Sequence, residues 1–101
     1  MILENDNNYV DVCGVPFEVK EVESNSREDG AMGRCDAKLG VITLNKEMPE
    51  PIKETTLIHE WLHGVLESNG LPDMSGNETL ICVLAAELFR NGFSIKRLSK
   101  H

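Results

Sequence analysis

A run of helical spacing between Ile52 and Asn69 constrains this chain more than any other feature. Its apolar residues share one broad face of a helix turned about 100° per residue: Leu57, Ile58, Trp61, Leu62, Val65 and Leu66. Gly70 and Pro72 follow the run and form a natural helix stop. The chain has 101 residues, which is room for one core and not for two. We therefore predict a single domain, residues 1–101, in which this helix packs on the other elements.

Composition and charge narrow the class of protein. Hydrophobic residues make up 41% of the chain and charged residues 27%, as in ordinary globular proteins, so we expect disorder only at the termini, with residues 1–8 as a flexible lead-in. The formal net charge is -7, from 17 acidic and 10 basic residues. Such a surface repels phosphate backbones. We therefore expect no direct nucleic-acid binding and favour a basic or amphiphilic peptide segment as the partner.

The cysteines and the apolar runs indicate the compartment. Cys13, Cys35 and Cys82 are widely spaced and odd in number, which argues for a reducing compartment and against a disulfide framework. The opening residues lack the basic start and the apolar stretch of a signal peptide. No run approaches the ~18 apolar residues of a membrane-spanning helix. The sequence therefore predicts a cytoplasmic protein without membrane contact.

Two stretches before the long helix have the pattern of strands. Residues 9–23 alternate apolar and polar side chains and predict a strand or an irregular strand pair, with a bend or an edge at Gly14 and Pro16. Residues 34–45 predict a hairpin, with "AKLG" as its turn and the β-branched "VITLN" as its second strand. The prolines of "KEMPEP" then end that strand, because proline cannot lie inside a sheet.

A second helix is predicted from about Asn77 to Asn91. The "SGNE" sequence at 75–78 has the S-x-x-E form of a capping box, and Gly92 ends the helix. A short loop, "GLPDMSG", connects it to the first helix, and the structure of the stretch "FSIKRLSKH" is left open. Together these elements predict an α+β fold, in which a small antiparallel or mixed sheet packs on the long helix and the second helix lies beside it.

The long helix carries an H-E-x-x-H motif at His59, Glu60 and His63. Residues four apart on a helix project side by side, so both imidazoles can reach one zinc ion at about 2.0–2.1 Å. Glu60 projects about 100° round the helix from His59, on the side of His63, where it can hold a metal-bound water and act as general base. The alternative is that two polar residues lie at the edge of the core by coincidence. Burying two histidines and a carboxylate without a shared purpose is costly, which favours the metal site.

A catalytic zinc needs a third protein ligand and an open position. Glu78, in the first turn of the second helix, is the best candidate, because the short connection turns that helix back onto the first. The alternative role for Glu78 is the capping box with Ser75. Glu67 and His101 are weaker candidates, since Glu67 must reach back along its own helix and His101 lies on a tail that is not expected to be rigid.

Two cysteines lie where a thiol could approach this metal as an inhibitory ligand. Cys35 belongs to the predicted hairpin, and Cys82 follows Glu78 by one helical turn. A lone cysteine is more often a small buried residue, and that is the expectation for both.

With these residues the chain resembles the ImmA/IrrE-type family of small bacterial and phage zinc metallopeptidases, which are gluzincin-like. The resemblance covers roughly residues 30–90 and consists of "GVITLN", "TLIHEWLHGVLE" and "ETLICVLAAEL". It implies a minimal zincin-like domain with one Zn²⁺ per chain, held by His59, His63 and Glu78. It also implies an origin in a phage or mobile element, a location in the host cytoplasm, and a regulatory protein such as a transcriptional repressor as substrate.

Two functions follow as expectations. In the first, the chain is a zinc-dependent metallopeptidase in which Glu60 takes a proton from the zinc-activated water. The "VITLN" strand could offer an edge to an extended substrate, and Tyr9 or Arg34 could assist at the oxyanion. In the second, the chain is a catalytically silent zincin-fold binding protein, an antirepressor or an inhibitor of a host protein. The presence of Glu60 favours the enzyme, because a structural zinc has no use for it. The oligomeric state is left open.

Overall fold

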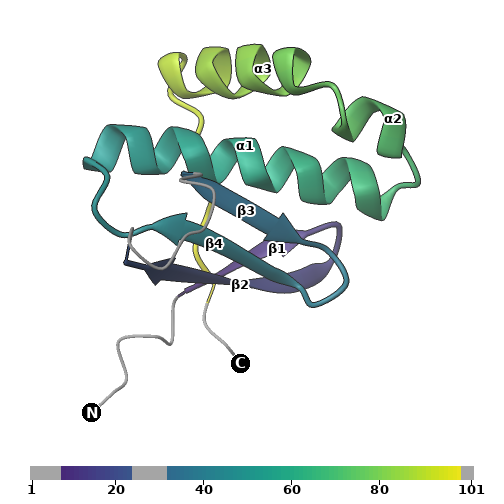
Figure 1. The fold of residues 1–101 in the computed structure, drawn as a ribbon, viewed down its shortest axis with the longest axis horizontal. Coiled ribbons are helices and arrows are strands. Elements are labelled where there is room, and N and C mark those ends of the chain that lie inside the picture. The colour runs from purple at the N-terminus through teal and green to yellow at the C-terminus, as the bar shows by residue number, and fades with distance from the viewer. Residues whose placement is uncertain (1–7, 24–31, 99–101) are drawn as a thin grey trace.

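The computed structural model describes residues 8–23 and 32–98 and shows the predicted α+β fold. Its elements are, in chain order, β1 (Tyr9–Val12), β2 (Val15–Val22), β3 (Gly33–Asp36), β4 (Val41–Asn45), α1 (Glu50–Ser68), α2 (Pro72–Ser75) and α3 (Glu78–Arg90). The strands form one mixed sheet, and α1 lies between that sheet and α3 (Figure 1). The lead-in predicted for residues 1–8 lies, except for Asn8, outside the described residues.

An antiparallel hairpin of β1 and β2 confirms the strand pair predicted for residues 9–23. Its two-residue turn consists of Cys13 and Gly14, with φ angles of 54° and 89°. Both angles lie in the left-handed region that such tight hairpin turns need, and glycine reaches it without strain. The pairing of β2 with β4 begins only at Glu18. Pro16 therefore lies outside that pairing, and its missing N–H interrupts no central ladder.

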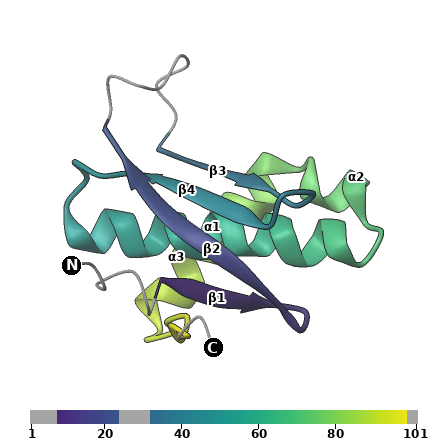
Figure 2. The same cartoon turned by 90° about the horizontal axis from the view of Figure 1, so that it is seen from below.

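The strand order is β1-β2-β4-β3, with β2 and β4 parallel and the other two pairs antiparallel (Figure 2). The hairpin predicted for residues 34–45 is confirmed as β3 and β4. The expectation that "VITLN" offers an edge is wrong, because β4 pairs with β2 on one side and with β3 on the other. The outer strands of the sheet are β1 and β3.

One face of the sheet packs on α1. The buried core consists of Val10, Val12, Phe17, Val19, Ile42, Leu44, Leu57, Ile58, Ala85 and Ile95. Two glycines let helix and sheet approach closely: a Cβ on Gly64 would lie 3.3 Å from Val12, and one on Gly33 would lie 2.7 Å from Thr56. Thr56 and Gly64 flank the histidine motif, so these two contacts fix the depth at which the motif lies against the sheet.

The helices begin and end close to the predicted residues. The predicted span of 52–69 corresponds to α1, whose first turn contains Pro51, where a helix needs no N–H partner. The predicted span of 77–91 corresponds to α3. None of the helices in residues 8–23 and 32–98 combines the length and the apolar character needed to cross a bilayer.

The connection between the long helices differs from the prediction. It is not a plain loop, because it contains α2, which begins with Pro72. The capping box is also wrong, since the N-cap of α3 is Asn77, whose Oδ1 accepts a hydrogen bond from the N–H of Leu80 at 3.1 Å. Ser75 ends α2 instead and is only 3% exposed. The serine is thereby available to side chains of α1.

After α3, residues 93–98 run back to the sheet (Figure 1). Ile95 is buried in the core, and the N–H of Leu98 donates to the carbonyl of Tyr9 at 2.7 Å. This contact forms an antiparallel bridge to β1. The stretch whose structure the sequence left open is therefore, up to Leu98, part of the packed domain.

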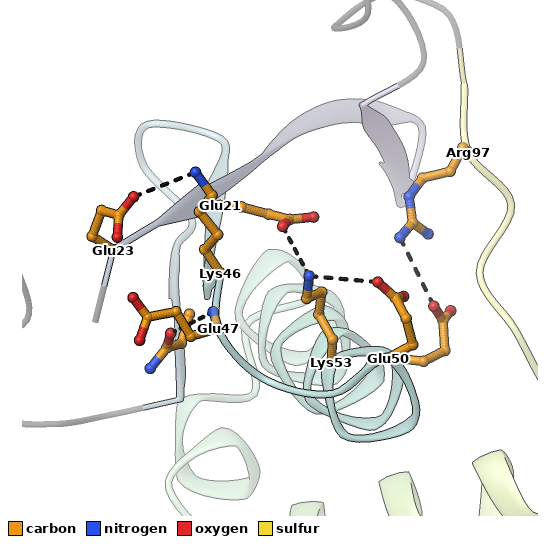
Figure 3. A network of polar contacts seen from close by, with 9 residues as sticks. Glu21, Glu23, Lys46, Glu47, Glu50, Lys53 and Arg97 are labelled. Atoms are coloured by element: carbon orange, nitrogen blue, oxygen red, sulfur yellow. Dashed lines mark hydrogen bonds and ion pairs between the residues drawn. The ribbon is translucent and has the colours of Figure 1, made fainter. Parts of the chain in front are cut away.

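A network of charged side chains anchors the first turns of α1 (Figure 3). The Nζ of Lys53 lies 3.0 Å from Oε1 of Glu21 on β2 and 3.6 Å from Oε2 of Glu50 on its own helix. The hydrogen bond to Glu21 raises the pKa of Lys53. From the returning tail, Arg97 reaches Glu54 at 3.9 Å. The start of α1 is thus tied to β2 and to the tail, upstream of the histidine motif.

Candidate metal centre

The two histidines of the motif lie side by side on α1, as their spacing predicts. Their ring centroids are 4.9 Å apart, and the Nε2 atoms of His59 and His63 are separated by 3.3 Å. Both side chains are largely shielded, with 19% of His59 and 12% of His63 exposed. The two nitrogens therefore face one small region of space at the surface that α1 turns toward α3.

Glu78 completes this group from the first residue of α3. Its Oε1 lies 3.0 Å from Nε2 of His59, and its Oε2 lies 3.1 Å from Nε2 of His63. The structure thus brings together the three side chains that the sequence nominates as metal ligands. Asn77, as the N-cap, starts α3 directly before Glu78 and so fixes the residue that enters the site.

The spacing of these atoms fits a tetrahedral zinc ion. Nitrogen and oxygen ligands bind zinc at about 2.0–2.2 Å, so at tetrahedral angles they lie roughly 3.3–3.5 Å from one another. The two N–O separations, each to a different oxygen of Glu78, are 3.0 and 3.1 Å, and the N–N separation is 3.3 Å. All three are within a few tenths of an ångström of that value. Two imidazole nitrogens and a carboxylate form a donor set that zinc favours, with three protein ligands and one position left over.

The neutral form of His59, which can bind a metal, is favoured by the surroundings of its ring. Burial lowers the pKa of its imidazole, an effect that the charge of Glu78 opposes and that of His63 reinforces. A metal binds the neutral ring and competes with the proton for the same nitrogen. Burial of His59 therefore favours the form that can act as a ligand.

Glu60 lies on the other side of His59, next to the sheet. It is 8% exposed, and a Cβ on Gly33 would lie 3.2 Å from its Cγ. His59 and Glu60 both line a cavity of about 320 Å³, whose remaining walls are Met32, Gly33, Thr55, Thr56, Cys82 and Ala85. Within this lining Glu60 is the one carboxylate. A small part of a peptide fits a space of this size.

Cys82 and Cys35 occupy different positions. The expectation that Cys82 is buried is wrong: it is exposed at the rim of the cavity, with its Sγ 3.8 Å from Nδ1 of His59. Donor atoms of His59, Glu78 and Cys82 lie within 4.8 Å of one another. Cys35 is half-buried, and burial, together with the charges of Glu60, Glu67 and Asp36, raises the pKa of its thiol to about 12. At neutral pH Cys35 is therefore a thiol and not the thiolate that binds metals.

The remaining candidates lie away from the three converging atoms. Oε2 of Glu67 accepts a hydrogen bond from the hydroxyl of Ser75 at 2.8 Å, and that hydroxyl is also 2.9 Å from Nδ1 of His63. Glu67 thus contacts His63, a nominated ligand, through the hydroxyl of Ser75. Tyr9 is on β1, at the opposite side of the sheet from β3, which carries Arg34. His101 lies outside the described residues.

Ser75 is the residue that sequence reasoning missed. The S-x-x-E pattern predicts a helix cap, whereas the serine contacts His63. The sequence does show that Ser75 lies between two helices that both carry nominated ligands. It does not show that Ser75 belongs to α2, which buries its side chain.

Comparison of the chain with protein-family models, with curated proteins and with solved structures gives no match.

Proposed function

We propose that this chain is a zinc-dependent metallopeptidase that binds one Zn²⁺ through His59, His63 and Glu78. The observation that carries the proposal is the convergence of three side chains, whose donor atoms lie 3.0–3.3 Å from one another. Lone pairs of two imidazole nitrogens and a carboxylate repel one another at such distances unless a proton or a metal cation lies between them. The resemblance to the ImmA/IrrE-type family, which rests on the motifs that contain these residues, points to the same function.

The chain's own residues have distinct roles in this proposal. Zinc supplies Lewis acidity, which activates water and polarises the scissile carbonyl. Glu60 accepts the proton of the attacking water and passes it to the leaving amine. Its burial keeps bulk water away from this transfer. Glu60 is not among the three converging groups, so in this proposal its carboxylate acts on the water and not as a metal ligand.

The substrate is proposed to be an extended segment of a protein. The outer strand β3 begins at Gly33, which also lines the cavity with Glu60. An extended peptide added to that edge would run past the cavity and the converging ligands. The charge of -7 favours a basic or amphiphilic segment. A transcriptional repressor in the host cytoplasm is the substrate that the family resemblance suggests, with neither nucleic acid nor membrane as a direct partner.

A binding protein with the same fold is the second candidate. The observation in its favour is Cys82, whose sulfur lies near His59 and is exposed. A thiolate in the fourth position would close the metal site and leave no place for substrate. Such a protein would act as an antirepressor or an inhibitor by contact alone.

Glu60→Gln separates the two candidates. The amide keeps the size of the side chain but cannot accept the proton of water, so zinc content and folding should be preserved. Cleavage of candidate host repressors should fall by about 10²–10⁴-fold, and chelator should abolish it in the wild type. Glu87→Gln makes the same chemical change at an exposed residue of α3 that pairs with Arg90, and it should leave both properties unchanged. Full activity of Glu60→Gln with zinc bound would exclude catalysis as the mode of action.

A further inference from the structure

A chain of two hydrogen bonds leads from the surface to His63. The carboxylate of Glu67 accepts a hydrogen bond from the hydroxyl of Ser75 at 2.8 Å. The oxygen of the same hydroxyl lies 2.9 Å from Nδ1 of His63. Glu67 follows His63 by one helical turn on α1, whereas Ser75 is contributed by α2. We refer to these three side chains as the relay.

The two hydrogen bonds of the relay can run in one donor-to-acceptor direction only, from His63 through Ser75 to Glu67. An ionised carboxylate can only accept, so the single hydrogen of the Ser75 hydroxyl is used on Glu67. Toward His63 the same oxygen must then accept, and Nδ1 of His63 must carry the donated hydrogen. In a neutral imidazole the other nitrogen, Nε2, is consequently bare. That atom is the one 3.1 Å from Glu78 and 3.3 Å from Nε2 of His59.

We infer that Ser75 and Glu67 are positioning residues, which hold the ring of His63 in the tautomer that presents a lone pair to the metal. The inference rests on the metal site proposed above. Without the relay, the alternative tautomer would place a hydrogen on Nε2, where it could donate to Glu78. The relay removes that option because the hydroxyl of Ser75 cannot donate to both Glu67 and His63. It therefore keeps a lone pair on Nε2 of His63, which can bind a cation, where the other tautomer would carry a hydrogen.

The setting of Ser75 fits this role. Its side chain is buried to 97%, with 3% exposed, and a buried hydroxyl needs partners for its hydrogen and its lone pairs. The two side chains that its hydroxyl contacts, His63 and Glu67, both belong to α1, one a nominated ligand and the other a carboxylate. The short helix α2, which has few residues of its own in the core, thus has a function in placing this hydroxyl.

Zinc affinity of relay variants tests the inference. Glu67→Gln keeps the shape of the side chain, but its amide can donate to Ser75 and so lets the hydroxyl turn toward His63. Ser75→Ala removes the hydroxyl. Each change should weaken zinc binding about 10–100-fold, measured by competition with a chelator of known affinity. Glu87→Gln is the matched control for loss of charge and should bind zinc as the wild type does. Ser75→Thr keeps the hydroxyl and should restore most of the affinity lost in Ser75→Ala.

The tautomer is a second readout that does not need the metal. Nitrogen-15 NMR of the metal-free protein, above the pH range in which histidine titrates, should show the His63 hydrogen on Nδ1 in the wild type. In Glu67→Gln and Ser75→Ala it should move at least partly to Nε2. A hydrogen on Nε2 in the wild type would overturn the inference, as would zinc affinity unchanged in both variants. The wild-type tautomer without any zinc uptake would instead refute the metal site and leave the relay standing.

Discussion

The two histidines of the site have opposite surroundings at their second nitrogen. Nδ1 of His63 meets a buried serine at 2.9 Å, and a carboxylate stands behind that serine. Nδ1 of His59 meets the sulfur of Cys82 at 3.8 Å, which is a weak hydrogen-bond partner and is exposed. We call the first the closed side, formed by His63, Ser75 and Glu67. The second is the open side, formed by His59, Cys82 and the cavity that contains Glu60.

The proposed hydrolytic metal site needs both a firmly held metal and room for reactants, and each side of the site suits one of these two needs. A ligand whose orientation is fixed by hydrogen bonds holds the metal firmly. A ligand beside a cavity leaves room for water, substrate and a base. The motif supplies two equivalent histidines, and the surrounding elements make them unequal: α2 covers His63, whereas the start of β3 and the exposed turn of α3 leave space next to His59.

Loss of Glu78 should have the largest effect, because its two oxygens contact both histidines and so span both sides. Glu78→Gln should weaken zinc binding by more than the roughly 10–100-fold expected for a lost outer partner such as Ser75. The measurement is zinc titration in competition with a chelator. Since the N-cap of α3 is Asn77, helix content by circular dichroism should change little. A zinc affinity equal to that of Glu87→Gln would mean that Glu78 is not a ligand.

Thiol reactivity should distinguish Cys82 on the open side from Cys35, the half-buried cysteine of β3, in the native protein. Cys82 and Cys13 are exposed, whereas Cys35 is half-buried with a pKa raised to about 12. The thiolate is the reactive form, so Cys35 should react on the order of a thousand times more slowly than an ordinary cysteine. Alkylation followed by mass spectrometry at neutral pH measures each rate. Equal rates at Cys35 and Cys82 in the folded protein would show that α1 and β3 do not shield Cys35.

Replacement of the thiol on the open side should have the smallest effect. Cys82→Ser should change zinc affinity by less than the ~10-fold lower bound for outer partners, because a sulfur at 3.8 Å holds the ring of His59 weakly. Cys13→Ser is the control in the β1–β2 turn. Cobalt-loaded wild-type protein should lack thiolate charge-transfer absorption in the near ultraviolet. If that absorption is present and disappears in Cys82→Ser, the open side is closed by a fourth ligand, and the binding-protein candidate gains support.

Features that depend on short stretches of chain were predictable from the sequence. The spacing of His59 and His63 is a property of any α-helix, and the short connection places the second helix beside the first, with Glu78 at its start. The two hairpins follow from alternation and turn residues in the same way. The α+β fold class and the proximity of the three nominated ligands could therefore be derived before the structure.

Features that depend on distant pairing were not predictable. The parallel pairing of β2 with β4 joins strands that no hairpin connects, and it makes β3 the outer strand instead of β4. Cys82 follows the buried Ile81 on α3. Among the described elements α3 packs mainly on α1, so the residue at the margin of its apolar face is exposed. Ser75 fits two local patterns equally well, and only the packing of α2 on α1 decides between them.

The bridge between Leu98 and Tyr9 has a consequence for how the protein is made. A ribosome releases β1 early and residues 93–98 after every other element that the structure describes. Until Ile95 emerges, the core lacks one of its buried side chains, and β1 lacks its outer backbone partner. A nascent chain that still lacks Ile95 should therefore be a substrate for chaperones and proteases, although its histidine motif and Glu78 have already been synthesised.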